Sequence, residues 1–227
     1  VRMRPLDPQV HPDGETEPAD AQSTQYSESQ GMSLKQASRT PVFSLVVIAL
    51  LFCLFSNMGT VQGAVPHLGD LGFSTETAAL ALAAVGFGSA TGKILFGWLC
   101  DTIRANLAFA IGLGFMLVSV FVLLTIRSGT SVNVILAYGL LMGLGAGAWL
   151  PALSILTSAN FGLAAYGVIF GIFNFAQCVG TATGPLFAGM MHDLTGSYLP
   201  AFLVFAALLG VSIPLSILAR TASRSHT

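Results

Sequence analysis

The sequence predicts an all-α membrane protein in which six transmembrane helices form two inverted three-helix repeats. Of its 227 residues, 54% are hydrophobic and only 8% are charged, unlike the composition of soluble domains. Six apolar runs are long enough to cross a hydrocarbon core, which takes about 20 helical residues. A segment of the second run also recurs in the fifth run. These three observations predict the fold class.

Residues 1–40 differ in composition from the rest of the chain. They contain four prolines, six acidic residues between Asp7 and Glu28, and a Ser/Gln-rich stretch. Such a segment cannot bury enough apolar surface to offset the entropy lost on ordering, so we expect a disordered cytoplasmic arm. It does not resemble a hydrophobic leader with a cleavage site. Because the chain opens with Val1 rather than methionine, we also expect further residues upstream.

The apolar runs begin at Val42, and helices explain them better than strands. A spanning strand alternates apolar and polar residues, whereas a run such as 45–55 is apolar on every face. We therefore expect a six-helix domain over residues 41–220, followed by a cytoplasmic tail over residues 221–227. The expected helices cover Val42–Val65, Thr77–Cys100, Asn106–Ile126, Val132–Leu156, Leu163–Met190 and Tyr198–Leu218.

The second and fifth runs carry the duplicated segment. Residues 88–101 read GSATGKILFGWLCD, and residues 180–193 read GTATGPLFAGMMHD. Their offset of 92 residues is too long for a solenoid repeat and suits a duplicated three-helix unit of a transporter. An odd number of helices per unit inverts the second unit in the membrane. The offset aligns Gly88, Ala90, Thr91, Gly92, Gly97 and Asp101 with Gly180, Ala182, Thr183, Gly184, Gly189 and Asp193.

The basic residues of the connections predict the orientation. If the helices alternate in direction, all but one of the basic residues outside the helices fall on one side of the membrane, and Arg127 stands alone on the other. The positive-inside rule then predicts a multi-pass protein of the cell membrane with both termini in the cytoplasm. The basic residues nearest the helices on that side are Lys35, Arg39, Arg104, Arg220 and Arg224.

Several function classes find no support in the sequence. A net charge of −1 gives no basic surface for nucleic acid. The four histidines lie in tails or connections, no carboxylate pair shares a helix face, and no phosphate-binding loop follows a strand, so we expect no enzyme and no cofactor. Each cysteine lies in a different run, without the paired spacing of a metal site or disulfide framework.

Lys93 is a charged residue inside an apolar run. Small residues, among them Ser89 and Gly97, share its helical face, which indicates that this face turns toward other helices or a water-filled path. A lysine at this depth costs about 2.5–3.5 kcal/mol on insertion scales and is usually paired or functional. Two interpretations remain open: Lys93 contacts a substrate, or its stem carries the ammonium to the cytoplasmic interface.

Two stretches resemble one family. Residues 92–101 resemble the loop signature between the second and third helices of a major facilitator superfamily half, and residues 184–198 resemble the junction of the eleventh and twelfth helices. The resemblance covers residues 42 to about 220. It implies the C-terminal half of a twelve-helix carrier in the lipid bilayer, with a missing N-terminal six-helix half as partner and residues 1–40 as the tail of the central loop.

Within the superfamily, the chain is most similar to the branch of the oxalate–formate antiporter and the monocarboxylate porters. In that branch a cation in the eighth helix contacts the substrate carboxylate, and Lys93 matches this position. The antiporter carries a second cation in its eleventh helix, where this chain offers Asn174 and Gln177, and Ser89 stands where some porters have an aspartate. The resemblance therefore implies a small organic anion, a mono- or dicarboxylate, that contacts Lys93 during alternating access. Ser89, Asn174 and Gln177 are further candidates to bind it, and Asn174 and Gln177 can also join helices through hydrogen bonds.

Charged residues at the ends of the repeats are candidates for gating. Asp101 lies at the cytoplasmic end of the second run near Arg104, where a carboxylate can pair with helix N-termini or arginines in one conformation only. Asp193 is its repeat counterpart. The alternative for Asp101 and for Asp193 is a solvated loop charge, and the repeat favours the gating interpretation for Asp101. Arg104 also replaces the glycine that is usual in the loop signature, so that signature is partial.

Other polar and small residues have two interpretations each. Asn57 and Gln62 in the first run can bind substrate or join helices through hydrogen bonds. Glycines 139, 143 and 147 of the fourth run indicate close helix packing, with a hinge as the alternative.

Two functions follow. The first is half of a secondary carrier for a small organic anion. The second is a six-helix membrane protein with a non-transport role as a receptor or assembly factor. The repeat and the intramembrane lysine favour the carrier.

Overall fold

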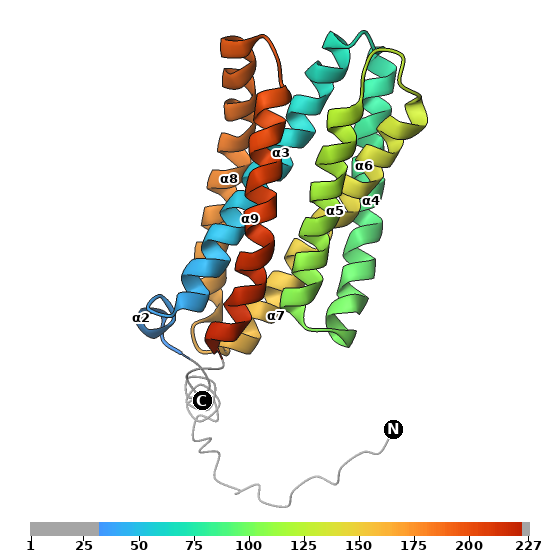
Figure 1. Cartoon of the computed structure of the whole chain (residues 1–227). Coiled ribbons are helices and arrows are strands. Elements are labelled where there is room, and N and C mark those ends of the chain that lie inside the picture. Colours follow the sequence, from blue (N-terminus) through green and yellow to red (C-terminus); the bar gives the residue numbers. More distant parts are fainter. Residues whose placement is uncertain (1–31, 224–227) are drawn as a thin grey trace, which may run out of the picture.

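The computed structural model describes residues 32–223, so most of the expected arm and residues 224–227 of the expected tail lie outside the described part (Figure 1). Residues 34–37 nevertheless form a short helix, α2 (Leu34–Ala37), inside the segment expected to be disordered. Ser33 and Gln36 close a capping box at its start, and Ala37 is buried. These contacts order the chain a few residues before the first spanning helix.

Six helical spans among the described residues are long and apolar enough to cross a membrane, and no strand is present there, as the sequence predicted. The fourth span consists of two helices separated at Gly147–Ala148, where the sequence predicted one. The fifth begins at Tyr166 rather than Leu163, because Gly162 has a φ of 74° and ends the preceding helix. The helices are α3 (Pro41–Asp70), α4 (Thr75–Thr102), α5 (Ala105–Thr125), α6 (Val132–Ala146), α7 (Trp149–Phe161), α8 (Tyr166–Thr195) and α9 (Leu199–Ser223).

The packing of the helices follows the two repeats. In the first unit α4 is the middle helix, and it packs mainly against α6, the start of the second unit. In the second unit α8 is the middle helix, and it packs mainly against α3, the start of the first unit. Figure 1 shows the outcome, with α8 and α4 on opposite sides of the bundle and the last helices, α5 and α9, between them. Each repeat therefore packs its middle helix against the first helix of the other repeat.

The duplicated glycines make these two contacts possible. A Cβ atom on Gly88 would lie 2.6 Å from the carbonyl oxygen of Leu140 in α6, and one on Gly180 would lie 2.7 Å from that of Leu51 in α3. Any larger residue would force the helices apart. Gly139 packs in the same way against Ala81, which supports close packing as the role of the fourth-run glycines.

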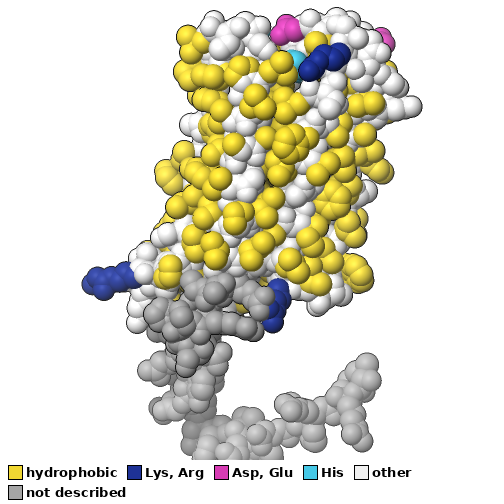
Figure 2. All heavy atoms as spheres, in the orientation of Figure 1, with side chains coloured by type: hydrophobic (Ala, Val, Ile, Leu, Met, Phe, Trp, Pro, Cys, Tyr) yellow, Lys and Arg dark blue, Asp and Glu magenta, His cyan; other side chains and the backbone are white. Residues whose placement is uncertain are grey.

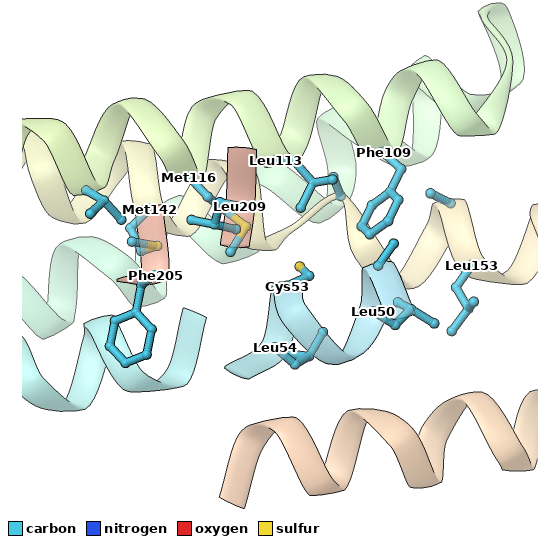
Figure 3. Close-up of a cluster of buried hydrophobic side chains, with 14 of the residues drawn as sticks. Leu50, Cys53, Leu54, Phe109, Leu113, Met116, Met142, Leu153, Phe205 and Leu209 are labelled. Carbon is cyan, nitrogen blue, oxygen red and sulfur yellow. The ribbon is translucent and has the colours of Figure 1, made fainter. Parts of the chain in front are cut away.

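The bundle has an apolar core and an apolar outer surface. Charged side chains lie at the two ends of the face shown in Figure 2, and a broad hydrophobic band separates them. Such a band suits contact with lipid along the length of the helices. The core shown in Figure 3 is built by α3, α5, α6, α7 and α9. Its labelled residues are Leu50, Cys53, Leu54, Phe109, Leu113, Met116, Met142, Leu153, Phe205 and Leu209.

Candidate functional site

A cavity of about 320 Å³ lies where α3, α4, α6, α7 and α8 meet. Asn57, Ser89 and Thr181 line it from near the middle of three long helices, so the cavity lies deep within the expected membrane span. Its size is that of a small-molecule site. The lining residues are Leu54, Asn57, Met58, Val61, Val85, Ser89, Lys93, Ala146, Trp149, Gln177 and Thr181.

Lys93 supplies the one ionisable side chain of this lining. It is exposed, and no carboxylate of a described residue lies within salt-bridge distance of its ammonium. Ser89 lines the cavity one helical turn before it. The surroundings of Lys93 are otherwise neutral polar or apolar groups, so the cavity presents a positive charge without a counter-ion from the described residues.

The α8 wall of the cavity contains Gln177 but not Asn174. The side-chain oxygen of Gln177, Oε1, is buried and has no hydrogen-bond partner among the described residues. Asn174 is not among the lining residues, and its Nδ2 donates to the carbonyl oxygen of Phe170 at 2.8 Å. The structure therefore brings together three of the four residues expected to bind substrate.

Three further polar or aromatic side chains line the cavity. Asn57, which the sequence left open as a substrate contact, is buried, and its Nδ2 lies 3.4 Å from the sulfur of Met142, a weak acceptor. Trp149 is the first residue of α7, so the helix break places it there. The repeat identifies Thr181 as well, because the offset of 92 residues aligns it with Ser89.

The first pair of gating candidates lies at the end of the bundle where the described chain begins and ends. Asp101 belongs to the last turn of α4 and is exposed, and Arg104 is the N-cap of α5. Arg104 lines two shallow hollows, one of them beside Asn106 and Ile217. The structure shows no ion pair between Asp101 and Arg104 within the described residues. Both are free to pair in another conformation.

The third gating candidate, Asp193, lies at the opposite end of the bundle. Its side chain is 85% exposed, and its Oδ1 is 3.9 Å from Nδ1 of His192. The same imidazole places Nε2 3.4 Å from Oδ2 of Asp70 and stacks on the ring of Tyr198. Burial, and then the negative charges of Asp70 and Asp193, raise the pKa of the Tyr198 hydroxyl. Asp193 thus belongs to a cluster that joins the ends of α3 and α8.

Across residues 32–223, no group of three or more His, Cys, Asp or Glu side chains is placed to hold a metal ion.

Six apolar spans in two interlocked repeats define a multi-pass membrane protein, and the lining of its deep cavity contains one cationic side chain. The family model of the Major Facilitator Superfamily matches residues 45–227. The chain therefore belongs to this superfamily of transporters.

The individual relatives that the chain matches are also named as transporters. The chain is 35% identical to the sialic acid transporter NanX of Escherichia coli over 71 residues, which is 31% of this chain and 18% of that protein. It is 25% identical to monocarboxylate transporter 12 of Rattus norvegicus over 163 residues, 71% of this chain and 34% of the relative. Monocarboxylate transporter 13 of the same species is 27% identical over 146 residues, 64% of this chain and 34% of the relative. The chain spans about a third or less of the length of these relatives.

Proposed function

We propose that this chain is the C-terminal half of a secondary transporter of the cell membrane that moves a small carboxylate by alternating access. The observation that carries the proposal is the ammonium of Lys93, which no carboxylate of residues 32–223 pairs, in a deep and otherwise uncharged cavity. Both termini would lie in the cytoplasm, as the basic residues of the connections indicate.

The charge of Lys93 favours an anion as the substrate. An unpaired cation at membrane depth is costly. A bound carboxylate offsets that cost, because it neutralises the cation and accepts a charge-assisted hydrogen bond from it. No side chain in the lining would repel the anion, because the lining contains no aspartate or glutamate. The names of the relatives agree, since monocarboxylates and sialic acid are carboxylic acids.

A second six-helix half would complete the site. Carriers of this architecture bind substrate at the interface between repeats. In the apolar 18-residue stretch of α4 and of α8, only 28% of the residues are buried, against 50% in α3 and α5. The helices α4 and α8, which both line the cavity, therefore have faces available for a partner. We use "complete carrier" for this chain together with that proposed N-terminal half.

Asp101, Arg104 and Asp193 would act at the two ends of the bundle as gating residues. Because they lie at the ends of α4, α5 and α8, a carboxylate or arginine there can form an ion pair in one conformation and release it in the other. The exposure of Asp101 and Arg104, which form no ion pair with a described residue, fits the released state.

Substitution of Lys93 tests the proposal. In the complete carrier, Lys93→Gln should abolish or severely weaken carboxylate uptake without reducing membrane insertion, because insertion is easier without the charge. Lys93→Arg should retain part of the activity, since it keeps the charge and changes the geometry. Near-normal uptake by Lys93→Gln at matched surface expression would refute the proposed role.

A further inference from the structure

The two repeats contribute one equivalent hydroxyl each to the cavity. The duplicated segments begin Gly-Ser-Ala-Thr-Gly at residue 88 and Gly-Thr-Ala-Thr-Gly at residue 180. Their second residues, Ser89 and Thr181, both line the cavity. Because α4 packs against α6 and α8 packs against α3, the two hydroxyls face the cavity from two different walls.

The fourth residue of each segment behaves differently from the second. Thr91 Oγ1 donates to the carbonyl oxygen of Phe87 at 3.0 Å, and Thr183 Oγ1 donates to that of Val179 at 2.7 Å. Serine and threonine in helices commonly bond to the preceding turn in this way. In each repeat, the threonine hydroxyl outside the cavity is therefore hydrogen-bonded to the backbone of its own helix.

Ser89 and Thr181 keep their hydroxyls free. Neither makes a hydrogen bond with a described residue, and neither oxygen is among the buried, unpartnered side-chain atoms. Both hydroxyls are therefore open to the cavity and able to donate or accept a hydrogen bond.

The two walls differ in charge. On α4, Lys93 follows Ser89 by one turn, so an ammonium and a hydroxyl can bind the same carboxylate. On α8, the residue that aligns with Lys93 is Pro185, and the wall offers Thr181 and the amide of Gln177. A neutral polar group finds partners on the α8 wall, whereas a second carboxylate would lose its hydration there without a cation from the described residues to replace it.

We propose that Thr181 determines specificity, and that the substrate is a monocarboxylate with a neutral polar group at its other end. Its carboxylate binds Lys93 and Ser89, and its polar group hydrogen-bonds to Thr181 beside Gln177. This inference rests on the proposed function and narrows its substrate class, because it excludes dicarboxylates as preferred substrates.

Three probes of equal chain length test this: succinamate, a monocarboxylate with a neutral amide; butanoate, which has an apolar tail; and succinate, which has a second carboxylate. The complete carrier should take up succinamate about fivefold or more faster than butanoate, the discrimination expected of one neutral hydrogen bond. Thr181→Val, which removes the hydroxyl and keeps the shape, should bring this ratio close to one by lowering succinamate uptake. Thr181→Ser should keep the ratio.

Thr183→Val is the matched control, because Thr183 is two residues away on α8 and its hydroxyl is bonded to its own helix. Its ratio should equal that of the wild type. The inference is overturned if Thr181→Val leaves the ratio intact, if Thr183→Val lowers it as much, or if the wild type prefers succinate. If Lys93→Gln abolishes uptake but Thr181→Val leaves the ratio of succinamate to butanoate uptake unchanged, this inference fails and the proposed function stands. A wild type that takes up no probe contradicts both the inference and the proposed function.

Discussion

The backbone of Gly147 packs directly against the backbone of Gly92, the residue that precedes Lys93. The fourth span breaks at the same place, where α6 ends and Trp149 begins α7 beside the cavity. The position of Lys93 in the cavity therefore depends on a contact between two glycines that no side chain could replace.

Alanine at Gly92 should destabilise the protein. Its Cβ would lie 2.5 Å from the carbonyl oxygen of Leu144, so α4 and α6 would have to separate, at a cost of about 1–3 kcal/mol. Gly97→Ala is the control, because no atom outside the local backbone of α4 lies within 4 Å of the added Cβ, and it should not destabilise. Thermal unfolding of the purified chain in lipid nanodiscs measures both variants. Equal unfolding temperatures would argue against the glycine contact.

The sequence predicts the helices well because each span is a long apolar run, but two of their boundaries depend on other features. The break at Gly147–Ala148 interrupts a continuous apolar pattern, and it occurs where α6 meets the backbone of α4. The start of α8 depends on the positive φ of Gly162. Both are properties of the backbone or of tertiary contacts rather than of hydropathy.

The cavity could be predicted only in part. Ser89 and Lys93 are one turn apart on one helix, so periodicity alone places them together. Gln177 and Thr181 reach the same cavity from α8, a relationship that depends on the packing of α8 against α3. Asn174 is one turn from Gln177, yet its amide bonds to its own helix, and helix periodicity cannot predict that rotamer.

Cysteine labelling tests the predicted orientation. In a background without Cys53, Cys100 and Cys178, a cysteine at Asp70 should react with an impermeant reagent added outside intact cells, and one at Arg104 should be protected. The reason is that these residues lie at opposite ends of the bundle, with the basic connections on the Arg104 side. The reverse labelling pattern would show that the orientation is inverted.

The purified chain alone should not transport. The proposed substrate path lies between two six-helix halves, and a single half leaves one side of its cavity open. Uptake of radiolabelled succinamate into liposomes should therefore equal that of protein-free liposomes. Robust uptake by the monomeric chain would mean that no second half is needed.

Tyr198 should make the protein sensitive to alkaline pH. Burial and the charges of Asp70 and Asp193 raise its pKa above the ordinary value of 10.0. As pH rises above that value, the unfolded chain releases the tyrosine proton before the folded chain does, so stability falls. Asp70→Asn should lower the pKa of Tyr198, because it removes a negative charge beside it. For the wild type and for Asp70→Asn, the tyrosinate absorbance minus that of the matching Tyr198→Phe variant gives the titration midpoint of Tyr198. An unchanged midpoint in Asp70→Asn would exclude a charge effect from Asp70.

The role of Lys93 in carboxylate binding is the central claim. The most direct test compares the uptake of succinamate with that of its uncharged diamide, succinamide. Both are measured for the wild-type complete carrier and for Lys93→Gln at equal surface expression. The wild type should take up succinamate strongly in preference to succinamide, and Lys93→Gln should lose that preference because the carboxylate no longer meets an ammonium. If Lys93→Gln still takes up succinamate at a near-normal rate and in preference to succinamide, Lys93 does not bind the substrate.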